Sequence, residues 1–112
     1  MPITVYPPFA STIQTVGSQT AVPASTITTL ATMTANGSRY VTRVSVSGQE
    51  YAKYTLHINS VLKETKRSGP DRSVEFEFDT PLGLASGDVL DVKVEHFVTG
   101  QTPDFEATIY GY

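Results

Sequence analysis

The chain has no cysteine among its 112 residues, and it has no Asp, Glu, Lys, Arg or His before Arg39. The absence of cysteine excludes both a disulfide framework and a thiolate metal site, so packing and hydrogen bonds must hold the fold. No stretch approaches the ~20 apolar residues that span a bilayer, and the first residues lack the basic and apolar pattern of a secretory signal. We therefore expect a protein that folds in the cytosol and contacts no membrane.

The lack of charge in the first 38 residues is the most informative feature of the sequence. A neutral segment rich in Thr, Ser, Pro and Val can be covered by a partner without stripping water from ions, which is the costly part of burying polar surface. Four prolines within the first 23 residues oppose helix formation and favour extended backbone. The pattern predicts an extended N-terminal arm over residues 1–25 that orders on a neighbouring subunit; a disordered tail is the alternative. The candidate interface residues of this arm are Tyr6, Phe9, Ile13 and Val16.

Residues 26–112 are expected to form a single domain, because they alternate apolar and polar side chains at the period of a β-strand. An Asn-Gly pair at 36–37 predicts a tight hairpin between the first two strands, and residues 81–88 are expected to be a connection. Short strands at turn spacings of roughly 8 to 12 residues, with no helical period, indicate an all-β antiparallel β-sandwich or jelly roll; a barrel is the alternative. The strands are expected at residues 26–34, 40–47, 51–58, 61–66, 74–79, 89–98 and from 105 onward.

The same alternation predicts which side chains form the core. In the strand over residues 40–47, it places Tyr40, Thr42, Val44 and Val46 on one face and Val41 on the opposite face. Inward positions expected on the later strands are Ala52, Tyr54, Leu56, Ile58, Val74, Phe76, Phe78, Leu90, Val92, Val94, Phe105, Ala107 and Ile109.

The net charge of −3 argues against a general nucleic-acid-binding role, since such domains usually present a basic face. One basic stretch, residues 63–72, carries four positive and two negative side chains, a local sum of +2. It is explained equally well by a solvated loop and by a contact with the acidic face of another copy or of a partner, where opposite potentials fix register. We include Arg67, within this stretch, among the candidate interface residues.

No catalytic, cofactor or metal site is predicted. The only histidines are His57 and His96, and they form no recognisable trio with a serine and an acid, so we expect surface or subunit-contact histidines. A small hydrolase using His96 is the enzyme alternative, and it lacks an activated nucleophile pattern. Acidic residues gather between positions 75 and 106, but their spacing fits no EF-hand loop, and the solvated face of a sheet explains them.

Three tyrosines, Tyr51, Tyr110 and Tyr112, fall in outward register. Exposed tyrosines anchor protein interfaces, because they add contact area at little rotamer cost. We therefore expect these residues to belong to an interface. Stacking on a host glycan is the alternative.

The chain resembles the small β-sandwich virion proteins of tailed bacteriophages, which include capsid decoration (cement) proteins and tail or fibre accessory modules. The residues that carry the resemblance are the Gly-Asp turn and strand within 82–95 and the closing segment 105–112. The resemblance implies a noncatalytic structural protein of the virion, assembled in the bacterial cytoplasm, whose partners are other copies of itself and major capsid or other virion proteins. A carbohydrate-binding or receptor-recognition module of a tail or fibre is the alternative.

Overall fold

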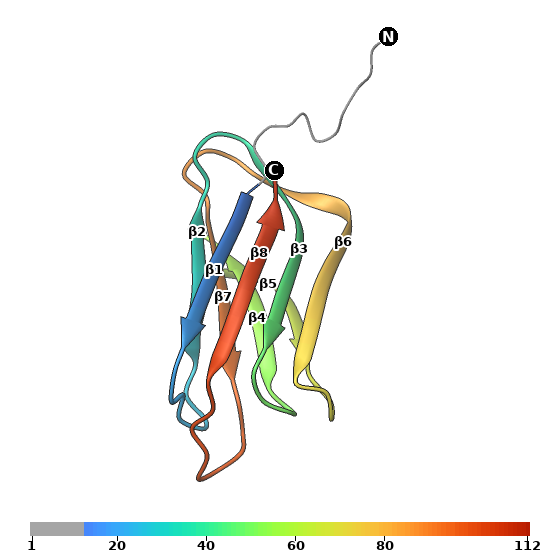
Figure 1. Cartoon of the computed structure of the whole chain (residues 1–112). Helices are drawn as coiled ribbons and strands as arrows, with labels where there is room; N and C mark the ends of the chain where they lie inside the picture. Colours follow the sequence, from blue (N-terminus) through green and yellow to red (C-terminus); the bar gives the residue numbers. More distant parts are fainter. Residues whose placement is uncertain (1–12) are drawn as a thin grey trace.

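A computed structural model of the chain describes residues 13–112. These residues form two four-stranded antiparallel sheets: sheet A has the strand order β1-β8-β3-β6, and sheet B has the order β2-β7-β4-β5. Figure 1 shows the two sheets stacked face to face. The strands are β1 (Ile13–Gln19), β2 (Thr28–Thr34), β3 (Arg39–Ser47), β4 (Lys53–Ile58), β5 (Val61–Arg67), β6 (Ser73–Leu84), β7 (Val89–Glu95) and β8 (Phe105–Gly111).

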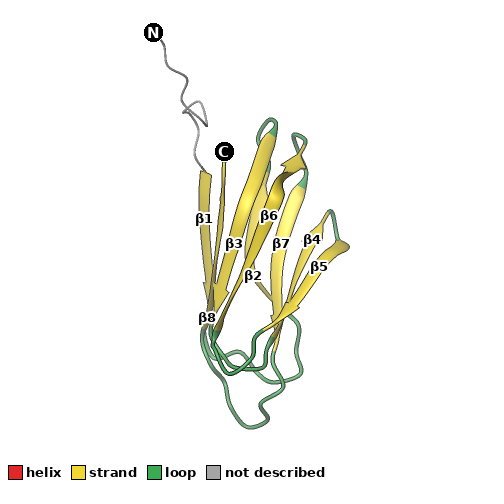
Figure 2. Cartoon of the chain, turned by 90° about the vertical axis from the view of Figure 1, so that its right-hand side faces the viewer, coloured by secondary structure: helices red, strands yellow, loops and turns green. Residues whose placement is uncertain are grey.

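The strand pairing has the nested order of a jelly roll. Strand β1 pairs with β8, β2 with β7, β3 with β6 and β4 with β5, as in one long hairpin rolled into two sheets. Only the β4–β5 connection joins neighbours within a sheet; every other connection between described strands crosses from one sheet to the other (Figure 2). The prediction of an all-β antiparallel sandwich or jelly roll is confirmed.

The core lies between the sheets and contains most of the residues expected to point inward; Ile58, Val74 and Phe78 are only partly buried. Tyr40, expected on the same face as Val44 and Val46, is instead exposed. Strands β4 and β7 contribute Tyr54, Leu56, Leu90 and Val92, all of which are fully buried. Phe105 of β8 packs edge-on against the Tyr54 ring, with 6.1 Å between ring centroids. Strong alternation of large apolar and charged side chains is therefore sufficient to orient these strands.

The predicted hairpin at residues 35–38 is wrong, because β2 and β3 lie in different sheets. Gly37 adopts a φ of 88°, so a tight turn does form there. The turn crosses between sheets and lies beside the β6–β7 turn: the Ala35 amide donates to the Asp88 carbonyl, and the Gly87 amide donates to the Ala35 carbonyl. The Asn-Gly pair thus predicted the turn correctly, but it did not identify the strand that pairs with β2.

Two further predictions about the strands are wrong. A bulge between Val41 and Arg43 shifts the register of β3, so Val41 and Val44 are both fully buried and Val41 is not on the outer face. Residues 81–84, expected in a connection, continue β6 to Leu84. Pro81 is tolerated there because β6 is an edge strand and its missing amide costs no ladder hydrogen bond.

The predicted boundary at residue 25 is also wrong, because residues 13–25 belong to the sandwich. Strand β1 pairs with β8 over seven consecutive positions. After it, Val22 is 2% exposed and its amide donates to the Pro103 carbonyl. Gly17 lets β1 approach β2 at the corner of the two sheets, where any Cβ would clash with the Leu30 carbonyl. Residues 1–12, with Tyr6 and Phe9, lie outside the described residues.

The Tyr54 hydroxyl is buried and has no hydrogen-bond partner among residues 13–112. Burial raises the pKa of Tyr54 to about 12; the nearby Gln49 backbone acts in the opposite direction, but it lies outside hydrogen-bond geometry. Since an unpartnered buried hydroxyl costs free energy, we expect Tyr54→Phe to raise the free energy of unfolding by about 1 kcal/mol. Urea denaturation tests this expectation, and a clear loss of stability in the variant would contradict it.

Among residues 13–112 there is no helix long and apolar enough to cross a membrane.

Candidate functional site

His96 is a structural residue of the core. Its side chain is fully buried and packs against the Phe105 ring, with 5.8 Å between centroids. The Val98 amide donates to Nδ1 at 3.3 Å, so Nε2 carries the proton and donates to the Val22 carbonyl at 2.8 Å. The prediction of a surface or subunit-contact histidine is wrong at this position. The alternation of the strand could have predicted this burial, because His96 follows Leu90, Val92 and Val94 at the next inward position.

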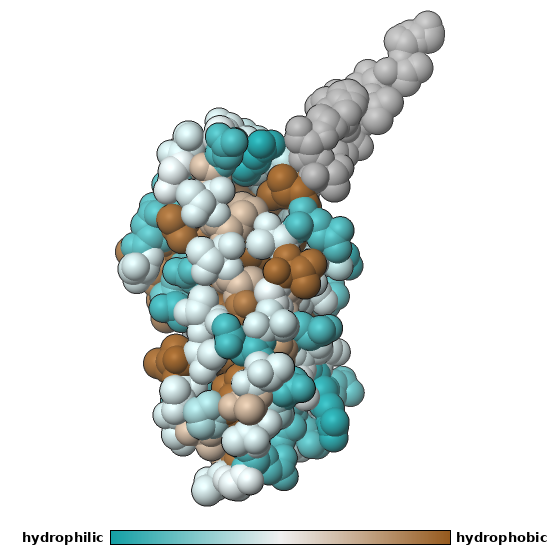
Figure 3. Space-filling model, turned by 60° about the vertical axis from the view of Figure 1, so that its left-hand side comes forward, coloured by the Kyte–Doolittle hydropathy of each residue, from teal (hydrophilic) through white to brown (hydrophobic). Residues whose placement is uncertain are grey.

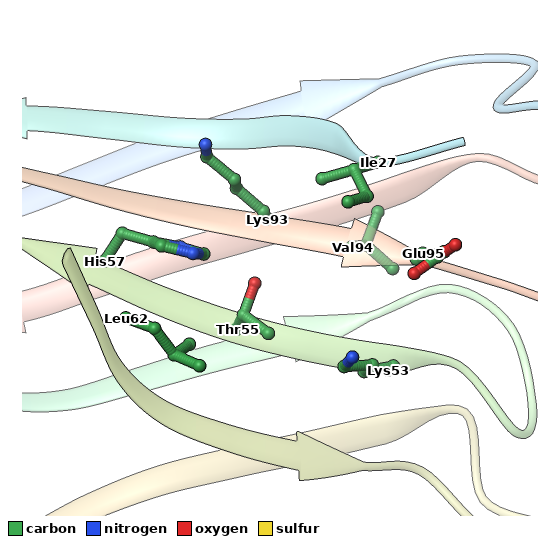
Figure 4. Close-up of a pocket in the computed structure, with 8 residues that line it drawn as sticks. All are labelled: Ile27, Lys53, Thr55, His57, Leu62, Lys93, Val94 and Glu95. Atoms are coloured by element: carbon green, nitrogen blue, oxygen red, sulfur yellow. The ribbon is translucent and has the colours of Figure 1, made fainter. Parts of the chain in front are cut away.

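A shallow hollow of about 190 Å³ lies on the outer face of sheet B. Figure 4 shows His57 and Leu62 at one end and Ile27, Val94 and Glu95 at the other. An engineered cavity of ~150 Å³ holds a benzene ring, so the hollow has room for one small ring. Its eight lining residues are Ile27, Lys53, Thr55, His57, Leu62, Lys93, Val94 and Glu95.

His57 is a titratable group of the hollow, and its surroundings lower its pKa. Burial lowers the pKa of His57 first, nearby Lys93 lowers it further, and Asp91 acts in the opposite direction. The Nδ1 atom of His57 is buried and has no hydrogen-bond partner in the described part of the chain. Among the described residues, no nucleophile or acid side chain is hydrogen-bonded to this atom.

The folded state therefore favours the neutral form of His57, and acid should destabilise it. The unfolded chain binds the proton near the ordinary value of 6.5, whereas the folded chain binds it only at lower pH. The contribution of His57 to the free energy of unfolding is fully present above about pH 6.5. It is lost as the pH falls from there through the lower pKa of the folded state. We expect the drop in urea midpoint between about pH 7.5 and pH 5.5 to shrink in His57→Gln. An identical drop in both proteins would contradict this origin.

An aromatic cluster lies on the outer face of sheet A, near the C-terminus. Tyr40 and Tyr112 exchange backbone hydrogen bonds, and their rings stack with centroids 5.4 Å apart. The guanidinium of Arg43 lies 4.1 Å above the Tyr110 ring and forms an ion pair with Glu75, at 3.5 Å between Nη1 and Oε1. Arg43 covers one face of Tyr110, so Tyr40, at 44% exposure, is the most open ring of the cluster.

The other predicted interface residues do not join this cluster. Tyr51 is 60% exposed but lies in the β3–β4 loop, at the opposite end of the sandwich from Tyr112 (Figure 1). Arg67 ends β5 opposite Lys53, and therefore lies near Tyr51. Ile13 packs inward against the core, whereas Val16 is 64% exposed on β1. The candidate residues are thus spread over at least three places.

The described part of the charge-free segment forms one side of the molecule. We call residues 13–38 the neutral wall; they comprise the adjoining edge strands β1 and β2 with the connections that follow each. The opposite side is charged. There Lys66 of β5 reaches across to β6, donating from Nζ to the Glu75 carbonyl at 3.0 Å and lying 5.7 Å from the Phe76 ring. The sandwich therefore has one neutral flank and one charged flank.

Among the described residues, no group of three or more His, Asp or Glu side chains could hold a metal ion. No protein-family model matches the chain, and no curated protein matches it in sequence.

Proposed function

We propose that the protein is a noncatalytic structural protein of a virion, of the capsid decoration (cement) kind. It attaches to other copies of itself and to major capsid or other virion proteins through its charge-free N-terminal side. Jelly rolls recur in viral capsid proteins, which agrees with the resemblance to phage virion proteins. Because one fold serves many functions, the proposal rests on the surface of this molecule and not on its fold.

The observation that carries the proposal is the neutral wall. Both edge strands on this flank come from the part of the sequence without ions, and residues 1–12 precede them directly. Covering the wall therefore desolvates no charge. An edge strand also offers backbone amides and carbonyls to an incoming strand, which supplies affinity without a specific side-chain code.

Immuno-electron microscopy of virions from the host that makes the protein tests the proposal. We expect an antibody against the recombinant chain to label intact capsids, and a chain lacking residues 2–12 to bind purified shells more weakly than the full chain. Label found only in the soluble fraction, or on tails alone, would contradict a decoration protein. Equal binding by the shortened chain would remove residues 2–12 from the attachment site.

The aromatic cluster supports a second candidate, a glycan-binding module of a tail or fibre, since jelly rolls also build lectin domains. If sugars stack on this cluster, a glycan array should show saturable binding that is lost in Tyr40→Ala and Tyr112→Ala. Tyr51→Ala is the matched control, because Tyr51 is exposed at the far end of the sandwich. Absence of binding, or equal loss in all three variants, would remove this candidate.

A further inference from the structure

We infer that two copies of the chain associate through their β1 edges, which pair antiparallel across a two-fold axis near Val16 and join two copies of sheet A into one. This contact deepens the proposed function, because it names the surface that joins two copies. It follows from the edge strands of the sandwich and does not depend on attachment to a capsid.

The four edge strands of the sandwich differ in how they resist pairing. Natural sheets protect exposed edges with charged side chains, proline or bulges. Strand β5 carries four charged residues in seven, and β6 carries three acidic residues and Pro81. Strand β2 is neutral but has a bulge between Thr29 and Ala31. Only β1 has neither charge, proline nor bulge, and it pairs with β8 in unbroken register.

A two-fold axis makes this lack of charge decisive. In an isologous contact each strand meets its own copy, so residues near the axis face themselves. A charged strand such as β5 then opposes like charges, which destabilise directly facing positions in a sheet. With the axis at Val16, β1 opposes Val16 to Val16, Thr15 to Gly17 and Gln14 to Ser18 of the other copy. None of these pairs contains an ion.

The side chains on β1 also suit a partner. Val16 stands at the middle of the strand on the outer face of sheet A, with 64% of its surface exposed. Beside β1 lies β2, which is likewise without charge, so an added strand meets no ion along the corner of the two sheets. Figure 3 brings this flank forward: pale and brown surface runs down its middle, with most of the teal surface toward its margins.

Sedimentation velocity on the full chain tests the inference, together with two lysine variants. We expect a concentration-dependent dimer, and we expect Val16→Lys to weaken it about 100-fold, because it places two ammonium groups face to face. Val61→Lys is the matched control: Val61 is a valine of similar exposure, 56%, on the opposite edge strand β5. It should leave the dimer unchanged. Thermal melts of the variants show that each remains folded.

A charge-pairing experiment makes the test specific to β1. Mixing Val16→Lys with Val16→Glu should restore a dimer that neither variant forms well alone. A chain lacking residues 2–12 should still dimerise. A monomeric full chain at about 1 mM, a dimer that survives Val16→Lys, or one lost with residues 2–12 would overturn the inference. Labelling of capsids is measured separately. Absence of a dimer would therefore leave the proposed function untouched, and absence of label on capsids would leave the dimer untouched.

Discussion

Removing residues 2–25 should abolish folding, whereas removing residues 2–12 should leave a folded sandwich. The longer deletion takes away β1, its seven-position ladder with β8, and the buried side chain of Val22. Each ladder hydrogen bond contributes ~1 kcal/mol, and burial of a valine contributes ~2 kcal/mol. The total loss, on the order of 5–10 kcal/mol, is comparable with the ~5–15 kcal/mol that stabilises a whole domain.

The longer deletion has a second effect on the core. The Val22 carbonyl is the acceptor for His96 Nε2, so the longer deletion also leaves a fully buried imidazole without its partner. Far-UV circular dichroism and urea denaturation of both deletions measure the result. A cooperative transition in the chain lacking residues 2–25 would show that β1 is dispensable and that residues 13–25 can act as a detachable arm.

The strands that the sequence predicted well are those whose two faces differ strongly. In β7, Leu90 and Val92 alternate with Asp91 and Lys93, so the apolar face can only point into the core. In β1 the inward positions include Thr15 and Gly17, and the outward positions include Val16. Its two faces scarcely differ in polarity, and the neutral composition favoured an arm. Side-chain alternation therefore could not show that β1 belongs to the sandwich.

The pairing of strands could not be predicted from local turn residues, for a different reason. Asn36 and Gly37 do form a turn, but a jelly roll brings β2 beside β7, which begins 55 residues after the end of β2 (34 to 89). The aromatic cluster could not be predicted for the same reason, since Tyr40 meets Tyr112 only because β3 and β8 pair. The outward register of Tyr112 could be read from the sequence, whereas its neighbour depends on the order of strands in the sheet.

The two histidines offer a direct comparison of a buried and a surface position. We expect His96→Leu to lower the free energy of unfolding by about 2–4 kcal/mol, because it leaves the Val22 carbonyl and the Val98 amide without partners and each such group costs ~1–3 kcal/mol. Leucine roughly keeps the volume, so the loss reports hydrogen bonds and not a cavity. His57→Leu should change stability by less than about 1 kcal/mol, because its Nδ1 loses no hydrogen bond.

Urea denaturation near pH 8, well above the pKa of a free imidazole, compares the two variants. A third variant separates hydrogen bonding from packing: His96→Gln keeps a donor that can reach the Val22 carbonyl and should lose less stability than His96→Leu. Equal losses in His96→Leu and His57→Leu would contradict a structural role for His96. Such a result would also weaken the assignment of residues 20–25 to the sandwich, since Val22 is held there by the same imidazole.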